Sequence, residues 1–425
     1  STGEVRRKTS NHDAFDNGHH HRCYRNKATS RYLMTSYRGL EFIPWEGQDT
    51  DRNHWVRGTC RLGAFPSNGM IYAPPHPCDC YISAKLNGLL ALTPASADRG
   101  QEPTAPRLAR GPAYQQIINH PSSIIHPAPG PTYRHDPQRS ATTPAPVEAE
   151  LEPLWKRRVD GSPSACTIAE GKVFVASVTT HEVCAFDATD GEPIWRFTAG
   201  GPVDTPPTIL QGQAIFGSTD GYVYCLRASD GQLAWRFRAA PRDRLVGAFG
   251  HLESAWPVHG AVLAENGRVY FAAGRSSFLD GGIHAYCLDA RTGEVVDERV
   301  VRTPHTMPVD EGRDQSKDYG ALTDVLVGAG EAVYMRGLRL FGSPQGSQSA
   351  PRLRSTAGLL DDSWFNRTHW LVDGKPQGEL LIGDDRTVVG VKAYATLNIN
   401  TGFFKPGTGG YELFASDRRP ASAGP

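Results

Sequence analysis

A repeat with a period of about 40 residues constrains the fold of this chain more than any other feature of its sequence. The stretch "KVFVASVTTHEVCAFDATDGEPIWRFTAG" from Lys172 aligns with "QAIFGSTDGYVYCLRASDGQLAWRFRAA" from Gln213, so that Trp195 and Trp235 lie 40 residues apart. A third copy from Arg268 keeps the order of strands and Gly turns but contains an insertion around residues 274–282. The short β-branched and aromatic runs, which end at Asp-Gly or Thr-Gly turns, indicate consecutive antiparallel hairpins.

A period near 40 residues with about four strands per unit predicts a β-propeller blade. Weaker versions of the pattern are "RYLMTSYRGLEFI", "GMIYAPPHPCDCYISAKLNGLLAL", "LLIGDDRTVVGVKA" and "GYELFASD". Three repeats alone would leave strand edges exposed, so the remaining chain is expected to complete a ring. We therefore predict an all-β fold, a β-propeller of about six to eight four-stranded antiparallel blades.

The repeat ends "DATDGEPIW" and "RASDGQLAW" resemble the repeats of quinoprotein-type (PQQ-binding-like) β-propellers. The opening "STGEVRR" looks like the end of one more such repeat. The stretches "PTYRHDPQRSA" and "AAGRSSFLDGGI" are similar to large propeller proteins of planctomycete-like bacteria. The resemblance covers nearly the whole chain and implies a propeller fold, but propellers support many unrelated functions.

Residues 94–150 are rich in Pro, Ala and Ser and show little periodicity, which predicts a linker. We expect residues 1–93 to form propeller blades that contain the Cys and His cluster, and residues 151–425 to form blades that complete the same ring. A boundary between two separate domains is the alternative reading of the segment.

The charge of the chain favours no class of anionic partner, because 45 basic residues balance 45 acidic residues. We expect no nucleic acid partner, and no apolar run is long enough to predict a membrane span. The first residues contain neither an initiator Met nor an apolar signal core, which predicts a mature or excised product. The families that the chain resembles imply a secreted or periplasmic location.

The eight cysteines are of two kinds. Cys184, Cys225 and Cys287 have nearly the same place in the three repeats, which predicts small core residues at equivalent blade positions. Cys166 is expected to be similar. Cys23 and the cysteines between residues 57 and 81 share no repeat position.

The stretch "RGTCRLGAFPSNGMIYAPPHPCDCY", residues 57–81, predicts a structural zinc site. Cys60, His76, Cys78 and Cys80 supply the Cys₃His ligand set of a closed tetrahedral site. In an extended segment residues 76, 78 and 80 point to one face, and a strand that ends at Cys60 would bring the fourth ligand. A disulfide from Cys60 to Cys78 or Cys80, with Cys23 as a further candidate, and free core thiols are the alternatives.

A second cluster, "NGHHHRCYRNKAT" followed by "RNHWVRGTC", brings His, Arg and Tyr together in the sequence. In β-elimination on uronic acid polysaccharides, Arg or His neutralises the sugar carboxylate, and His or Tyr moves protons. The candidate catalytic residues are His19, His21, Arg22, Tyr24, His54 and Arg57. The combination is similar to propeller-type ulvan lyases, which as a family carry such residues beside a structural zinc. Hydrogen-bonded loop histidines are the alternative.

Two further polar stretches are candidates for sugar contact, "GRSSFLDGG" at residues 274–282 and "DDSWFNRTHW" at residues 361–370. Ordinary loops that cap a blade have the same composition. Glu253 and His259, in "ESAWPVHG", have no recognisable catalytic spacing, so packing is expected there.

Three functions remain open from the sequence. The first is a propeller that binds a protein or carbohydrate partner on one face, as resemblance to the propeller lipoprotein of the outer-membrane barrel-assembly machine implies. The second is a secreted lyase that cleaves an acidic, uronic-acid-containing polysaccharide. The third is a quinone-dependent dehydrogenase, whose catalytic relatives use a vicinal cysteine pair. This chain has no adjacent cysteines, so no PQQ is expected.

Overall fold

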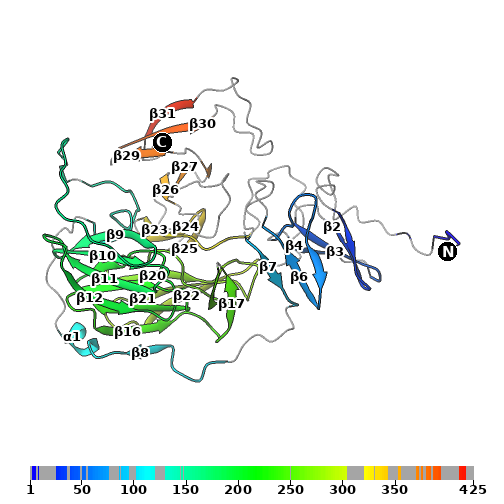
Figure 1. Ribbon diagram of the computed structural model, residues 1–425, viewed down its shortest axis with the longest axis horizontal. Coiled ribbons are helices and arrows are strands. Elements are labelled where there is room, and N and C mark those ends of the chain that lie inside the picture. The colour runs from blue at the N-terminus through cyan, green and yellow to red at the C-terminus, as the bar shows by residue number, and fades with distance from the viewer. Residues whose placement is uncertain are drawn as a thin grey trace, which may run out of the picture.

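The computed structural model places the chain in a series of antiparallel β-sheets (Figure 1). The structure describes residues 2–5, 8, 25–35, 39–47, 50–53, 56–75, 86, 88–94, 102–119, 130–143, 145–146, 148–248, 250–303, 320–329, 331–342, 353–355, 370–372, 375–376, 380–383, 386–393 and 411–417. Within these residues the single α-helix is α1 (Tyr114–Asn119). No described helix has the length and apolar character needed to cross a membrane.

The first blade lies within the best-repeated part of the sequence. From the innermost strand outward it consists of β9 (Pro163–Ala169), β10 (Lys172–Ser177), β11 (Glu182–Asp187) and β12 (Pro193–Thr198). Asp187 Oδ1 accepts the N–H of Thr189 at 2.8 Å, and Asp190 Oδ1 accepts the N–H of Glu192 at 2.9 Å. These side-chain contacts close the turn between β11 and β12, which explains the Asp residues at the end of the repeat.

The second blade repeats this order and gains an additional strand. It consists of β13 (Thr208–Leu210), β14 (Gln213–Gly217), β15 (Tyr222–Arg227), β16 (Leu233–Arg238) and, outside β16, β8 (Leu108–Arg110). β8 pairs antiparallel with β16, and α1 follows it along the outer side of the blades (Figure 1). The predicted linker thus contributes a strand to the sheet, while the predicted domain boundaries at residues 93 and 151 stay a prediction.

The third blade follows after an inserted hairpin. The hairpin consists of β17 (Leu245–Ala248) and β18 (His251–Ser254), and the blade of β19 (Leu263–Glu265), β20 (Arg268–Ala273), β21 (Ile283–Asp289) and β22 (Val295–Val301). The innermost strands of neighbouring blades are in contact, because β13 touches both β9 and β19, and β19 touches β23. The innermost strands therefore face the common axis of the blades.

The three blades from β9 to β22 are called the body here, and shorter sheets precede and follow it in the sequence. Before it lie β1 (Lys27–Ala28), β2 (Tyr32–Thr35), β3 (Leu40–Pro44) and β4 (Asp51–Asn53), and then β5 (Phe65–Ser67), β6 (Met70–Ala73) and β7 (Leu90–Leu92). After it lie β23 (Leu326–Ala329), β24 (Ala332–Met335) and β25 (Leu338–Phe341), then β26 (Leu353–Ser355), β27 (Trp370–Val372) and β28 (Lys375–Pro376), and finally β29 (Leu380–Gly383), β30 (Thr387–Ala393) and β31 (Tyr411–Asp417).

The hydrophobic cores lie between successive blades. One core joins the first and second blades through Phe174 and Phe216, and another joins the second and third through Trp235 and Phe271. The N-terminal sheets share a core with the body, since Leu40 belongs to the same cluster as side chains of the third-blade insertion. The prediction of an all-β propeller of antiparallel blades is confirmed.

The repeat cysteines bear out the prediction of small core residues. Cys184, Cys225 and Cys287 are buried on β11, β15 and β21, with 6%, 0% and 5% of their surface exposed. Burial raises the pKa of all three thiols, which disfavours reactive thiolates. Cys166 was expected to be similar and is instead exposed on β9, because strand alternation turns it away from the face of buried Thr167.

Candidate functional site

One end of the blades, called the loop face here, carries most of the buried polar side chains of the body. It is formed by the turns between the second and third strands of each blade and by the connections to the next blade. These segments are residues 178–181 and 199–207 in the first blade, 218–221 and 239–262 in the second, and 274–282 and 320–325 in the third.

Three polar residues of the loop face occupy equivalent positions in consecutive blades. In the hairpins that begin the blades, the last paired residues of the innermost strands are Leu210, Glu265 and Ala329. Asp204, His259 and Thr323 each lie six residues before those positions. The propeller repeat therefore brings them to corresponding places near the axis, although they have no chemical group in common.

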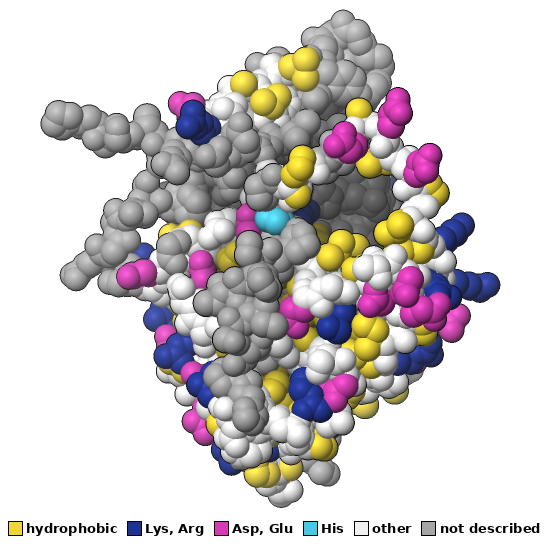
Figure 2. Space-filling view, turned by 90° about the vertical axis from the view of Figure 1, so that its left-hand side faces the viewer, with side chains coloured by type: hydrophobic (Ala, Val, Ile, Leu, Met, Phe, Trp, Pro, Cys, Tyr) yellow, Lys and Arg dark blue, Asp and Glu magenta, His cyan; other side chains and the backbone are white. Residues whose placement is uncertain are grey.

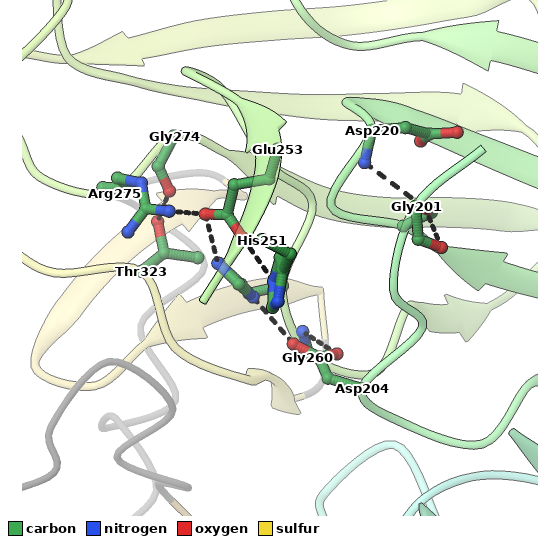
Figure 3. Close-up of polar contacts among 11 residues, drawn as sticks. Gly201, Asp204, Asp220, His251, Glu253, Gly260, Gly274, Arg275 and Thr323 are labelled. Carbon is green, nitrogen blue, oxygen red and sulfur yellow. Dashed lines mark hydrogen bonds and ion pairs between the residues drawn. The ribbon is translucent and has the colours of Figure 1, made fainter. Parts of the chain in front are cut away.

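Asp204 and His259 form the first contact of this site (Figure 3). The Nδ1 atom of His259 lies 2.7 Å from Oδ2 of Asp204, and the backbone N–H of Gly260 donates to Oδ1 of the same carboxylate at 3.0 Å. His259 is only 9% exposed. The carboxylate thus holds both the imidazole ring and the backbone beside it in one orientation.

Glu253 is the centre of the site (Figure 3). It extends from β18, its side chain is 0% exposed, and its Oε1 lies 3.9 Å from Nε2 of His259. Its Oε2 lies 3.3 Å from Nε2 of His251, and the Arg275 guanidinium forms an ion pair with the same carboxylate. Because Arg275 comes from the insertion between β20 and β21, Glu253 connects the hairpin to the third blade.

The surroundings lower the pKa values of two basic residues of the site. Burial lowers the pKa of Arg275 to about 10, against the opposing effect of Asp280. Burial also lowers the pKa of His251, and the charges of His181, Arg275 and His259 act in the same direction. The fully buried carboxylate of Glu253 is the most sheltered group of the site, whereas the side chain of His251 is 33% exposed.

A second carboxylate of the loop face, the half-buried Asp220, lies in the turn between β14 and β15. Tyr224 donates its hydroxyl hydrogen to Oδ2 of Asp220 at 2.6 Å, and the N–H of Tyr222 donates to Oδ1 at 3.0 Å. Burial raises the pKa of both Asp220 and Tyr224. The Tyr hydroxyl therefore satisfies the carboxylate without a compensating cation.

This arrangement resembles an oriented base but lacks the openness of a catalytic centre. His259 has a carboxylate on Nδ1, as catalytic histidines often do, but its Nε2 faces the fully buried Glu253. Among the described residues no group of three His, Cys, Asp or Glu side chains is arranged to hold a metal ion. The network is best suited to holding the loop face rigid.

The residues predicted for β-elimination are mostly not described. His19, His21, Arg22, Tyr24 and His54 lie outside the described residues. Arg57 is described and is only 1% exposed, near the core of the N-terminal sheets. Of the stretch 361–370, only Trp370 is described, at the start of β27. The catalytic assignment therefore stays a prediction.

Of the four predicted zinc ligands, the structure describes only Cys60. His76, Cys78 and Cys80 lie outside the described residues, and Cys60 is exposed. The hydroxyl of Thr59 donates to the carbonyl of Pro75 at 2.6 Å. The residues that precede Cys60 and His76 in the chain are thus in direct contact.

The sequence drew attention to Glu253, His259 and the stretch 274–282 that contains Arg275, but Asp204 and His251 were missed. Glu253 and His259 were expected only to pack, and they do so as members of an ion-paired network. Asp204 had a usable signal, because it has the same repeat position as His259. Aligning the connections between blades, and not only the strands, would have found the pair.

The hairpin β17–β18 presents a different surface on each face. Glu253 and His251 point inward to the network, whereas Leu245 and Leu252 are 64% and 69% exposed. The pairing of Gly247 with Leu252, and of Leu245 with Ser254, places the two leucines on one outer face. Figure 2 shows hydrophobic side chains interspersed with charges of both signs on the described surface.

Comparison with known proteins agrees with the blade architecture. Residues 148–337 match the family described as Outer membrane protein assembly factor BamB. The chain is 28% identical over 232 residues to the alcohol dehydrogenase (quinone), dehydrogenase subunit, of Gluconacetobacter polyoxogenes, covering 50% of this chain and 29% of that protein. It is 30% identical over 173 residues to the outer membrane protein assembly factor BamB of Bordetella pertussis, covering 41% of this chain and 38% of that protein.

Among solved structures, BamB from Moraxella catarrhalis aligns with 87% of this chain and 93% of its own, at 12% identity and a TM-score of 0.29. The chain spans less than half the length of the two curated relatives named above. The planctomycete and ulvan lyase resemblances stay predictions. Residues 148–337 of this chain carry the PQQ-like repeat of the BamB type.

Proposed function

We propose that this chain is a propeller scaffold that binds a protein partner on its loop face, through the hairpin β17–β18. The observation that carries the proposal is the pair of exposed leucines, Leu245 and Leu252, on a hairpin inserted between two regular blades. Exposed apolar side chains of this size, on an element that the repeat does not need, are typical of interaction sites.

The network beneath the hairpin supports this function. Glu253 lies on the inner face of the same strand as Leu252, and its ion pair with Arg275 attaches the hairpin to the third blade. A rigid hairpin loses little conformational entropy when a partner binds. Similarity to outer membrane protein assembly factors supports a protein as the partner and a periplasmic or secreted location.

Site-specific photo-cross-linking in the native host tests the proposal. A photo-reactive phenylalanine derivative is introduced in place of Leu252, and in a separate variant in place of Val296, which is 48% exposed on the outer strand β22. We expect one reproducible cross-linked protein from position 252 and none from position 296. The identified partner, once purified, should bind the Leu245→Asp variant at least about tenfold more weakly. Equal cross-linking at both positions would reject the hairpin as the site.

The second proposal is polysaccharide β-elimination by His19, His21, Arg22, Tyr24, His54 and Arg57. It is supported by the types of these residues and their closeness in the sequence. Incubation with a uronic-acid-containing polysaccharide should then produce unsaturated ends that absorb ultraviolet light. If the wild type forms this product and a His21→Ala variant does not, the lyase function is preferred to the scaffold. If the wild type forms no product, the lyase function is rejected.

For cofactors, we propose a structural zinc ion on Cys60, His76, Cys78 and Cys80, and no PQQ. The contact of Thr59 with Pro75 supports the zinc site, since it brings together the two chain segments that carry the ligands. The similarity to a quinone-dependent alcohol dehydrogenase subunit makes PQQ-dependent oxidation the third candidate. Dye reduction by the purified chain with added PQQ and calcium would establish it.

A further inference from the structure

Residues 130–142, called the axial segment here, lie along the innermost strands of the blades. The N–H groups of Ile168, Ile209 and Gly328 donate to the carbonyls of Gly130, Pro131 and Pro137, at 2.8, 2.7 and 2.9 Å. These three donors are equivalent in their blades, because each directly precedes the last paired residue of its innermost strand. The segment therefore covers strand edges that would otherwise be open toward the axis.

The side chain of Arg139 extends from the axial segment toward the strands that it covers. Its side chain is 0% exposed, and its Nε donates to the carbonyl of Leu326 at 3.1 Å. Its Nη2 donates to the carbonyls of Ala261 and Val262 at 3.3 and 3.1 Å. Ala261 and Val262 lie directly before β19, and Leu326 is the first residue of β23, so one guanidinium contacts the chain where two consecutive sheets begin.

The remaining acceptors come from the axial segment itself. The Nη1 atom of Arg139 donates to the carbonyl of Tyr133 at 3.0 Å and to Oγ1 of Thr132 at 2.5 Å. Thr132 in turn lies 2.8 Å from the hydroxyl of Thr208 on β13. The three nitrogen atoms of the guanidinium thus donate to five neutral oxygen atoms, and four of these are backbone carbonyls.

The environment is adapted to the shape of a guanidinium rather than to its charge alone. Burial lowers the pKa of Arg139 to about 10, while Asp136 and Tyr133 oppose that shift. The hydrogen bonds of Arg139 are all to neutral acceptors. A guanidinium presents five N–H donors on three nitrogen atoms in a fixed planar fork, whereas a Lys ammonium has three donors on a single nitrogen atom.

The backbone of the axial segment adopts an unfavourable conformation near this contact. Arg134, His135, Arg139 and Ala141 have positive φ angles of 55°, 76°, 57° and 56°. Non-glycine residues adopt this left-handed region at a cost, and such residues persist only where surrounding contacts hold them. The guanidinium contacts are among the contacts that hold the segment in this conformation.

We propose that the axis of this propeller contains a guanidinium-binding site, formed by the carbonyls of Tyr133, Ala261, Val262 and Leu326, which the chain occupies with its own Arg139. The axial segment is then an internal ligand that closes the axis and joins neighbouring blades. When the side chain is removed, the site takes a small alkylguanidinium from solution.

Chemical rescue of an Arg139→Ala variant tests this site. Hydrogen exchange is measured by mass spectrometry in peptides that contain Ile168, Ile209 and Gly328, whose amides contact the axial segment. We expect exchange at least about tenfold faster in the variant, because several hydrogen bonds to a charged group are lost. Ethylguanidinium at low millimolar concentration should restore protection, whereas ethylammonium at the same concentration should not.

Two further variants keep the test decisive. Arg139→Lys retains the charge and is expected to show the same loss of protection. This variant provides the test if the Ala variant does not fold. Arg134→Gln is the matched control, since the side chain of Arg134 lies over the ring of Tyr133 and outside the carbonyl site. Equal rescue by ethylammonium, no rescue by ethylguanidinium, or wild-type exchange in Arg139→Lys would each overturn the proposal.

Discussion

The indole Nε1 of Trp195 donates a 3.0 Å hydrogen bond to the carbonyl of Ala228, which belongs to the next blade. The same contact recurs from Trp155 to Ala188 at 3.0 Å and from Trp235 to Ala290 at 3.2 Å. Each indole also covers the turn glycine beside its acceptor. The Trp and Gly of the repeat are therefore spaced so that each blade attaches to its successor.

Replacement of Trp195 by Phe should lower the free energy of unfolding by about 1–3 kcal/mol, because the buried carbonyl of Ala228 loses its donor. Trp45→Phe is the matched control. Its indole N–H also donates to a carbonyl, that of Thr29 at 2.8 Å, but the side chain is 46% exposed and water can take its place. Urea denaturation of both variants measures the difference. Equal losses of unfolding free energy would contradict a stabilising role for the hydrogen bond from Trp195 to Ala228.

Gly231→Ala should destabilise the protein by more than the cost of its backbone conformation. The added Cβ would lie 2.7 Å from Cδ2 of Trp195, and the φ of 74° is already unfavourable for Ala. Gly171→Ala has a similar φ of 70° but no atom within 4 Å of the added Cβ, so it isolates the backbone cost of about 1 kcal/mol. Thermal unfolding should show a clearly larger decrease in Tm for Gly231→Ala.

Glu253→Gln should lower the free energy of unfolding by about 3–5 kcal/mol, because it removes the charge of the fully buried carboxylate that pairs with Arg275. The exposed pair of Arg299 and Asp297, 3.3 Å apart, supplies the control. Asp297→Asn should change stability by less than about 0.5 kcal/mol. Denaturant titration distinguishes the two, and a neutral Glu253→Gln would show that the network contributes nothing to the loop face.

Glu265→Gln should stabilise the protein near neutral pH but not in acid. Burial raises the pKa of Glu265 above its usual 4.5, and the charge of Asp136 in the axial segment adds to the shift. The folded state then holds the proton more tightly than the unfolded state, so wild-type stability falls as pH rises from about 4.5. The Tm advantage of the variant should grow over that range. An advantage that is independent of pH would reject a titration effect.

Zinc removal should destabilise the N-terminal sheets if the Cys₃His site forms. We expect about one zinc per chain, with metal-to-sulfur distances near ~2.3 Å. Cys78→Ser should abolish zinc retention and lower Tm. Cys166→Ser is the control, because Cys166 is an exposed thiol on β9 outside the ligand set. Elemental analysis and X-ray absorption measure these outcomes, and a disulfide between Cys60 and Cys78 or Cys80 would exclude the site.

The fold class was predictable because the determinants of a blade are local. Strand alternation, the Asp and Gly turn residues and the repeated Trp all act within one repeat or between adjacent repeats, so their spacing is visible in the sequence. The burial of Cys184, Cys225 and Cys287 followed from the same periodicity. Cys166 did not follow it, because the alternation within β9 turned the side chain outward.

The tertiary structure alone decided where the irregular segments lie. Nothing in the composition of residues 94–150 predicts that β8 joins β16 or that Arg139 reaches the carbonyls of Ala261 and Leu326. Likewise, Asp204, Glu253 and Arg275 come from three different connections and meet only after the blades pack. The sequence determined each blade through short-range patterns, whereas contacts between loops depend on the curvature of the assembled ring, which no local pattern encodes.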